Sequence, residues 1–373
     1  MSNRIVITEY KNKTIVVFIK NDSVIKMRAL GSADEMTGTI YLGRIQSVKG
    51  NIDSCFVKYN EKSGFLKGKN RKPETVLPIM LKKETSSNKM DEVTDKLSIA
   101  GIFSVVTSVD TGMSFSSRFD NDEKKEFETL GLSNAIIRLN AKNTDINTVK
   151  TEYEYLNSIL NKVNDIKDKR VDNSILYSGI PALINVVFSE NYREYEEILT
   201  DSNEVYNLIN QFYKEYENNN IKIDFPVRLY EDDLVSLPAF ISLSSKVDRA
   251  LCKTIYLKSD ANLTFDYTEA MTVIDVNSGT TTFKGDKAEV IHKINIEAAK
   301  EIALQLKLRN ISGIIIVDFM KEYKKSYNEE LIEILRQELK NDDQHAKCYG
   351  MTKLGLVEIT RNRTNKFLYE QLK

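Results

Sequence analysis

Residues 270–320 read AMTVIDVNSGTTTFKGDKAEVIHKINIEAAKEIALQLKLRNISGIIIVDFM, and this stretch determines the expected fold of the C-terminal part. Its first largely apolar run, MTVIDV, is short, as is typical of a buried strand. A loop, a long helical pattern and a second apolar run, IIIVDF, follow. A further helical segment, NEELIEILRQELKND, and a last strand near LGLVEIT complete a strand–helix–strand–helix–strand order, which predicts an α/β layer.

Two aspartates end these apolar runs. Asp275 and Asp318 each follow at least three apolar residues. Both strand ends of such a unit lie at one edge of the sheet, so one cation could reach both carboxylates, with Asn277 beside them. Mg²⁺ prefers this arrangement and would activate water for phosphodiester hydrolysis. The spacing alone also allows a simpler interpretation, in which each aspartate only caps a loop or a helix.

Residues 3–107 are rich in short strands. RIVITEY, TIVVFIK and DSVIKMRAL alternate apolar and polar residues, which predicts a three-stranded antiparallel meander. Five later segments predict a small OB-fold barrel: TIYLGRIQSV, DSCFVKYN, SGFLKG, VLPIML and GIFSVVT. The polar stretch 83–97 is expected to be a long loop.

The middle of the chain becomes helical near Thr144 or Asp145, either of which is a suitable N-cap. Apolar residues recur at threes and fours as far as Val163, which predicts an amphipathic helix. Between 173 and 252, ALINVVFS and KIDFPVRLY are expected to be strands, and SNEVYNLINQFYKEYE and SLSSKVDRALC helices.

The composition narrows the chemistry. A chain of 373 residues is expected to form two or more subdomains. Its three cysteines are far apart, which argues against a disulfide framework and a thiolate zinc site, and only two histidines are present. Hydrolysis would therefore depend on carboxylates and a hard cation. Without an apolar run of about 20 residues or a signal-peptide core, we expect no membrane insertion and a cytoplasmic location.

The charge is unevenly distributed. The net charge is −1, but residues 58–89 contain nine Lys or Arg against three Glu. Phe56 and Phe65 lie on neighbouring predicted barrel strands in or beside this stretch, where exposed aromatics would stack on unpaired bases. Either ring could instead belong to the barrel core, and the basic stretch could be an ordinary solvated face.

Arg361 and Arg363 follow the last predicted strand in GLVEITRNR. Their guanidinium groups could grip phosphates, or they could simply be solvated.

Taken together, these segments resemble the ribonuclease E/G family. The resemblance is strongest over 270–320, through the I-D-x-N-S loop, the N-x-E-A-A helix and the Q-L-x-L-R-N-x-x-G-I-I-I-x-D-F strand. Further family segments are resembled by GTIYLGRIQSV, CFVKY, SGFL, LYEDDLVSLPAF and GLVEITRNR, in the same order along the chain.

The resemblance implies roles for individual residues. Asp275 and Asp318 match the family's magnesium-binding aspartates, and Asn277 the asparagine beside them. Phe56, Phe65 and Lys89 match RNA-contacting residues of the OB domain. Arg138 matches an arginine that reads the 5′-monophosphate of RNA.

The resemblance also implies a multi-subdomain α+β fold. An RNase H-like domain would be interrupted by an RNA-binding OB-fold barrel and a 5′-sensing segment, and a DNase I-like α/β domain would follow. The expected boundaries are 1–34 and 176–252 for the RNase H-like parts, 35–105 for the barrel, 106–175 for the sensor and 253–373 for the catalytic domain.

Three departures from the family pattern limit these expectations. Leu139 stands where the sensor has threonine, and Met90 where a glycine follows the OB lysine. The C-P-x-C motif that shares zinc between subunits is absent from the sequence. We therefore expect no structural zinc, and a homodimer, if formed, without a zinc link.

The sequence thus predicts an endoribonuclease that hydrolyses single-stranded RNA with Mg²⁺, or Mn²⁺ in its place. Its roles would be rRNA maturation and mRNA turnover, with a 5′-monophosphate end as a possible recognition feature. The alternative is a catalytically weak or inactive RNA-binding relative that acts in regulation or ribosome assembly.

Overall fold

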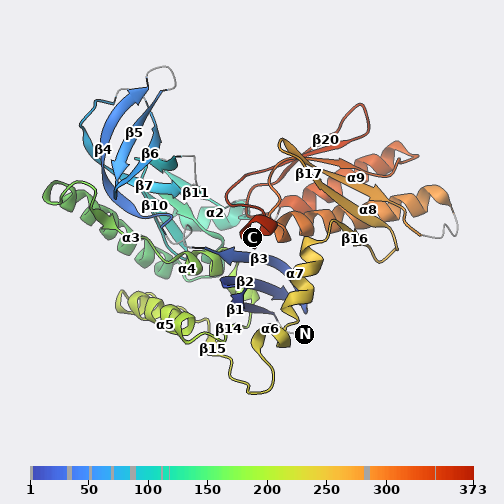
Figure 1. Ribbon diagram of the computed structural model, residues 1–373, viewed down its shortest axis with the longest axis horizontal. Helices are drawn as coiled ribbons and strands as arrows, with labels where there is room; N and C mark the ends of the chain where they lie inside the picture. Colours follow the sequence, from blue (N-terminus) through green and yellow to red (C-terminus); the bar gives the residue numbers. More distant parts are fainter. Residues whose placement is uncertain are drawn as a thin grey trace. The chain divides into compact units, whose positions relative to one another are not determined.

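The computed structural model describes residues 3–31, 36–49, 53–68, 71–84, 90–110, 112–116, 118–280, 286–340 and 342–373. They form a mixed α+β structure of two compact units (Figure 1). Unit 1 comprises Met1–Ala29, Tyr195–Ser202 and Arg228–Lys373, and unit 2 comprises Leu30–Glu194 and Asn203–Val227.

The first sheet of unit 1 contains the three strands of the expected meander. Its order is β15-β14-β1-β2-β3, with β1 antiparallel to β2 and parallel to β14. The strands are β1 (Arg4–Tyr10), β2 (Lys13–Lys20), β3 (Ser23–Leu30), β14 (Glu197–Thr200) and β15 (Val227–Leu229). Helices α6 (Leu237–Phe240), α7 (Leu243–Leu251) and α10 (Leu368–Gln371) pack against it, and Val6, Val17, Leu243 and Leu368 share one core.

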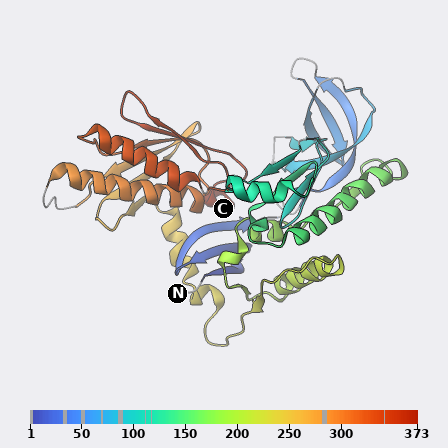
Figure 2. The same ribbon diagram turned by 180° about the vertical axis from the view of Figure 1, so that it is seen from behind.

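The second sheet of unit 1, here called the C-terminal sheet, has the order β16-β17-β18-β19-β21-β20. Its strands are β16 (Thr254–Tyr256), β17 (Asn262–Tyr267), β18 (Met271–Asn277), β19 (Gly313–Asp318), β20 (Lys347–Met351) and β21 (Val357–Arg361). Helices α8 (Lys287–Leu308) and α9 (Lys325–Lys340) lie side by side (Figure 2) and share a core with alternate residues of the strands. The opposite side of the sheet is called the open face below.

Unit 2 contains a closed barrel of five strands, as expected of an OB-like fold. The sheet closes because β4 pairs with both β5 and β7. The strands are β4 (Ile40–Lys49), β5 (Ser54–Tyr59), β6 (Lys62–Lys67), β7 (Val76–Lys83) and β8 (Asp91–Thr94), and β13 (Ile175–Tyr177) also pairs with β4.

The prediction that GIFSVVT forms the fifth barrel strand was wrong. GIFSVVT contributes β10 (Ser104–Thr107) to a separate sheet of order β11-β12-β10-β9, with β9 (Ser98–Ala100), β11 (Met113–Phe115) and β12 (Ala135–Ile137). The barrel is completed instead by β8, inside the stretch expected to be a loop. Its apolar content is small: Val93 enters the core, and the buried Asp91 accepts a hydrogen bond of 2.5 Å from the hydroxyl of Tyr59.

Helices complete unit 2. Among its described residues they are α2 (Asn121–Glu128), α3 (Ile146–Ile166), α4 (Ala182–Val187) and α5 (Asn203–Asn218), with short 3-10 turns at η2 (Leu139–Ala141), η3 (Lys167–Lys169) and η4 (Tyr192–Glu194). Asp145 is the N-cap of α3, since its carboxylate accepts from the amide of Thr148 at 3.1 Å.

ALINVVFS was wrongly predicted to be a strand, because it forms α4. Pro181 immediately precedes the first helical residue, Ala182. Proline fixes φ near the helical value and lacks the amide that a helix start leaves unpaired, so this local effect outweighs the β preference of the apolar run. Among the described residues, no helix is both long and apolar enough to cross a membrane.

Candidate active site

Asp275 and Asp318 are direct partners in the parallel pair β18–β19. Their neighbours Ile274, Val276 and Val317 enter the core beneath α8 and α9. Because successive side chains of a strand alternate between faces, both aspartates belong to the open face. Asp318 is exposed and Asp275 half-buried. Adjacent strands are about 4.8 Å apart, so the two carboxylates, called the aspartate pair below, lie within reach of one another.

Asn277 lies two residues beyond Asp275 on the same face and donates a hydrogen bond of 2.6 Å to the Asp275 Oδ2. A tight turn follows, in which Gly279 has a φ of +56°. A Cβ at this position would lie 2.2 Å from the carbonyl oxygen of Asp260, in the β16–β17 turn. The chain after β18 can therefore pack against this turn only with glycine at 279.

The aspartate pair fits a hard divalent cation. Mg²⁺ commonly uses one or two protein carboxylates and completes its shell with water and substrate oxygens. The described residues contain no group of three or more His, Cys, Asp or Glu placed to hold a metal ion. A cation at the aspartate pair would therefore depend mainly on two carboxylates and on oxygens that the protein does not supply.

A second group of polar residues fixes the chain after Asp318, which sequence reasoning did not identify. The buried Asn295, on α8, donates to the carbonyl of Met320 at 2.7 Å and accepts from its amide at 3.1 Å. It also donates to Glu322 at 2.9 Å. His292, one helical turn away, contacts Glu322 at 3.1 Å and stacks on Tyr327. The N-x-E-A-A motif contains Asn295, but nothing in it revealed the distant partners.

Phe56 and Phe65 are direct partners in the antiparallel pair β5–β6, and their ring centroids are 6.3 Å apart. Both rings are half-buried, whereas Cys55 and Val57 fill the barrel core. Strand alternation therefore places the two rings on the outer surface of the barrel. The alternative that they belong to the core is not what the structure shows.

Much of the positive charge near these rings is already paired. Lys62 contacts Glu84, Arg71 contacts Asp95, and Lys82 lies 3.5 Å from Glu92. Lys58 and Lys67 are exposed on the strands that carry the rings, and Lys67 also lies 3.9 Å from Glu92. Lys89, expected to contact RNA, lies outside the described residues.

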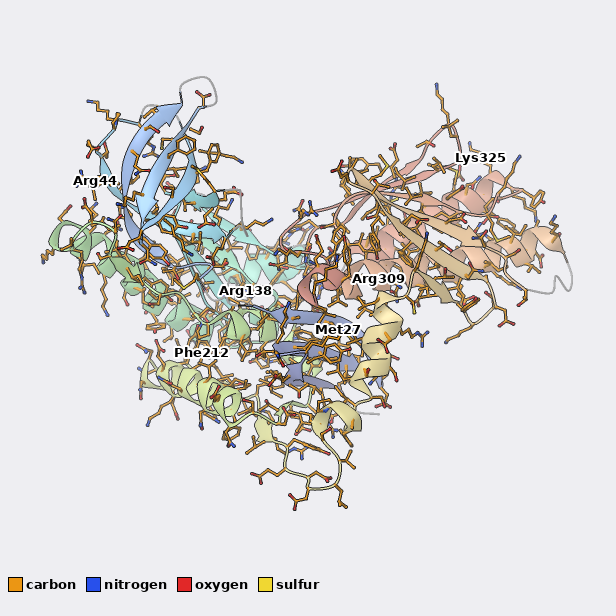
Figure 3. All side chains as sticks on the ribbon, viewed as in Figure 1. Met27, Arg44, Arg138, Phe212, Arg309 and Lys325 are labelled. Carbon is orange, nitrogen blue, oxygen red and sulfur yellow. The ribbon has the colours of Figure 1, made fainter. Side chains whose placement is uncertain are left out.

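Arg138, expected to read a 5′-phosphate, is labelled in Figure 3 among the side chains of unit 2, and its guanidinium group contacts backbone carbonyls. It donates to the oxygens of Gly101 and Phe188, the latter at 3.2 Å. Burial lowers the pKa of Arg138, and the charge of Glu152 opposes this. Two of its donors thus serve the protein itself.

The neighbours of Arg138 offer little to a phosphate through their side chains. Leu139 is half-buried and apolar. Asn140 is only 1% exposed, donates to the carbonyl of Phe188 at 2.7 Å and accepts from the amide of Tyr192 at 3.1 Å. In this conformation, the side chain of Asn140 therefore cannot make the hydrogen bond that a threonine hydroxyl at position 139 would make.

Arg361 and Arg363 differ completely in environment. The side chain of Arg361 is fully buried and bonds to Asp342 at 2.9 Å and to the carbonyl of Ile311 at 3.0 Å. Its guanidinium group is thus engaged within the protein and is not presented to RNA. Arg363 is exposed and lies over the ring of Phe367, so it remains a candidate phosphate contact.

The structure therefore brings together Asp275, Asn277 and Asp318 in unit 1, and Phe56 and Phe65 in unit 2. Arg138 also belongs to unit 2, and Arg363 to unit 1.

Comparison with known proteins identifies similar chains. The sequence model of the "Ribonuclease E/G family" matches residues 98–364 of this chain. A "Ribonuclease E/G-like protein" of Pyropia yezoensis is 27% identical over 395 residues, covering 99% of this chain and 77% of that protein. "Ribonuclease E" of Synechocystis sp. is 27% identical over 396 residues, covering 99% and 58%. "Ribonuclease G" of Escherichia coli K12 is 26% identical over 365 residues, covering 89% and 73%.

Proposed function

Because this chain belongs to the ribonuclease E/G family, we propose that it is an endoribonuclease that hydrolyses single-stranded RNA with the help of Mg²⁺. The observation that carries the proposal is the register of β18 and β19, which makes Asp275 and Asp318 direct partners on an open sheet face. Mn²⁺ could replace Mg²⁺, since both favour oxygen ligands.

In this proposal Asp275 and Asp318 would hold the cation. Mg²⁺ bound there supplies an activated water and charge stabilisation for hydrolysis. Asn277 fixes the orientation of the Asp275 carboxylate through its 2.6 Å hydrogen bond, which leaves the other carboxylate oxygen for the cation. The Asn295–Glu322 contacts keep the chain after Asp318 from shifting that residue.

Selection of single-stranded RNA would come from the barrel. Phe56 and Phe65 present two rings on its outer surface, and a base can stack on an aromatic ring only when it is not paired within a duplex. Lys89 and the exposed Arg363 would add phosphate contacts.

Recognition of the 5′ end would be weak. Arg138 is committed to carbonyls, and Leu139 lacks a hydroxyl group. We therefore propose a modest preference for 5′-monophosphorylated over 5′-hydroxyl RNA, which Leu139→Thr would raise. A strong preference in the wild type that Leu139→Thr fails to raise would contradict this.

We further propose an RNase H-like character for residues 1–34 and 176–252, a DNase I-like character for residues 253–373, a cytoplasmic location, and roles in rRNA maturation and mRNA turnover.

The test is cleavage of a labelled single-stranded RNA with and without Mg²⁺. Asp275→Asn and Asp318→Asn should each reduce cleavage to at most about 1% of the wild-type rate, about 3 kcal/mol or more in the barrier, with RNA affinity nearly unchanged. Asp266→Asn is the matched control, because Asp266 is an exposed carboxylate of β17 whose ion pair, within the described part of the chain, is with the exposed Lys253. It should cleave normally, since an exposed ion pair contributes little.

Two outcomes would overturn the assignment. If Asp275→Asn or Asp318→Asn kept substantial activity at saturating Mg²⁺, the aspartate pair would not be the metal site. If the wild type bound RNA but never cleaved it with Mg²⁺ or Mn²⁺, the alternative of an inactive RNA-binding relative would hold.

A further inference from the structure

A row of polar side chains crosses the open face at the aspartate pair. Thr254 of β16 is the direct partner of Thr264 of β17, and Thr264 is the partner of Asp275. Asp275 is in turn the partner of Asp318. Because directly opposite residues of neighbouring strands share a face, two threonine hydroxyls continue the line of the two carboxylates. The hydroxyl oxygens of the threonines are 3.4 Å apart.

Tyr256 ends the adjacent row. It is the direct partner of Asn262, and Asn262 is the partner of Asn277. Its intervening neighbour Ile255 enters the core beneath the helices, so Tyr256 belongs to the open face. It is 71% exposed, one of the most exposed aromatic side chains in the described part of the chain. A ring this exposed contributes little to the stability of the fold, and it is available to a ligand.

The distance suits a nucleotide close to the cut. Tyr256 lies two strand spacings from Asn277, roughly 10 Å. Successive bases of a stacked strand are about 3.4 Å apart, so a strand bound at the aspartate pair reaches Tyr256 within about three nucleotides.

We propose that Thr254, Thr264 and Tyr256 form a binding subsite for the RNA strand immediately beside the scissile phosphodiester. A base stacks on the Tyr256 ring, and the threonine hydroxyls donate to phosphate or ribose oxygens. This inference rests on the proposed function. It is separate from the rings of the barrel, because it uses only residues of the C-terminal sheet.

The chemistry of the surface favours RNA as its occupant over a protein. The row is continuous with the carboxylates that hold the cation, and it is made of hydroxyls, amides and one ring rather than of an apolar cluster. Aromatic stacking on a base has no sequence requirement, since every base has a π-face. The subsite would therefore strengthen binding near the cut without specifying a base.

The test combines protein variants with an RNA that has a single cleavage site. Abasic residues are introduced one at a time on each side of the cut. In the wild type, one position within about three nucleotides of the cut should lose about tenfold in kcat/KM when its base is removed. In Tyr256→Ala, an abasic residue at the same RNA position should not lower kcat/KM further, because the stacking partner is already missing. Tyr256→Phe should behave like the wild type.

Tyr349→Ala is the matched control. Tyr349 is 55% exposed and lies on β20, beyond β21 on the other side of β19. This variant should keep the sensitivity to the abasic position near the cut. Equal kcat/KM in Tyr256→Ala and wild type, or loss of the abasic effect in Tyr349→Ala as well, would overturn the inference.

Equilibrium binding measurements distinguish failure of the proposed subsite from failure of the proposed function. With Asp275→Asn as background, the RNA stays intact and equilibrium affinity can be measured. Tyr256→Ala should weaken binding of a short oligonucleotide spanning the cut by several-fold even where no turnover is seen, and unchanged affinity would overturn the subsite. If the wild type does not cleave the RNA but Tyr256→Ala still weakens binding, only the proposed catalysis is overturned. A Tyr256→Ala variant that changed oligomeric state instead of RNA affinity would identify the face as a protein interface.

Discussion

Gly279 shows how one residue positions the chain at the end of β18. Its left-handed φ of +56° and the 2.2 Å that would separate a Cβ at this position from the Asp260 oxygen leave no room for a side chain. Gly279→Ala should force the turn away from Asp260 and displace Asn277, two residues earlier. We expect cleavage to fall at least tenfold and the free energy of unfolding to drop by about 1–3 kcal/mol, measured by RNA cleavage and by denaturant titration.

The control for this substitution is Gly131→Ala. Gly131 has nearly the same φ, +58°, but open space around its Cβ position. It should show only the conformational cost of about 1–2 kcal/mol and leave cleavage unchanged. Equal effects of the two substitutions on cleavage would show that the contact with Asp260 is irrelevant.

We expect the two outer rings of the barrel to bind unpaired RNA bases. Phe56→Ala and Phe65→Ala should each weaken single-stranded RNA binding by about 1–3 kcal/mol, because each removes a stacking surface. Both rings are half-buried and outside the barrel core, so the melting temperature should change little. Phe240→Ala, which removes a 51% exposed ring elsewhere, should not alter binding. Unchanged affinity together with a lower melting temperature would mean that the rings serve packing.

At the scale of elements, α3 holds the turn before β10 through one buried carboxylate. Glu152 accepts from the amides of Ile102 at 2.7 Å and Ser104 at 2.7 Å, and from that of Phe103 at 2.9 Å. Burial raises the pKa of Glu152, and these hydrogen bonds act against that rise. The same turn contains Gly101, whose carbonyl binds Arg138.

Glu152→Ala should therefore destabilise unit 2 by about 3–5 kcal/mol, because three buried amides lose their acceptor and Arg138 loses a nearby charge. Hydrogen exchange at residues 102–104 should become much faster. Glu154→Ala changes an exposed position of the same helix and should do neither. If exchange at these amides stayed slow in Glu152→Ala, another acceptor would have to hold the turn.

Elements with a long or uniform pattern could be predicted, and those that depend on partners could not. The periodicity of α3 and α8 and the apolar runs of β18 and β19 are local properties of the chain. Strand β8 has four residues with one apolar core side chain, and it exists because β6 and β7 pair with it. Helix α4 was missed because a proline start overrode an apolar, β-branched composition.

The same division applies to the site. The strand-end positions of Asp275 and Asp318 were visible in the sequence, whereas their direct pairing required the register of β18 and β19. The burial of Arg361 was not visible, because its partner Asp342 lies 19 positions away and adjoins another contact, Asp343. The outward orientation of Phe56 was left open by the sequence, since alternation gives two faces but does not say which one is the core.

A buried ion pair joins β3 of the first sheet of unit 1 to the connection between α9 and β20. Lys26 of β3 is 1% exposed, and its ammonium group lies 2.5 Å from Asp343. Burial opposes ionisation of Asp343, but the charge and hydrogen bond of Lys26, together with the charge of Arg361, outweigh it and lower the pKa of Asp343.

A carboxyl group with a lowered pKa in the folded state stabilises the fold above its unfolded pKa, and this contribution is lost as pH falls through the folded pKa. We expect the free energy of unfolding to decrease from about pH 4 downwards, measured by urea titration across pH. Asp343→Asn should remove this part of the pH dependence and cost about 3–5 kcal/mol at neutral pH, because the buried ammonium group of Lys26 loses the negative charge beside it. Asp233→Asn, at an exposed acid, should leave the pH profile intact. An identical acid profile in Asp343→Asn would contradict the assignment.

The discontinuity of unit 1 has a consequence for the order of events during synthesis on the ribosome. Its first core combines Val6, Ile15 and Met27 with Leu368 and Leu372, so strands made at the beginning are completed by residues made near residue 373. At about 5–20 residues per second, β3 emerges roughly 15–70 s before α10 exists. Unit 2 ends at Val227 and is fully synthesised well before that. The nascent chain should therefore carry a folded barrel while unit 1 is still incomplete, so the proposed active site lacks its completed unit until residues 368–372 have been translated.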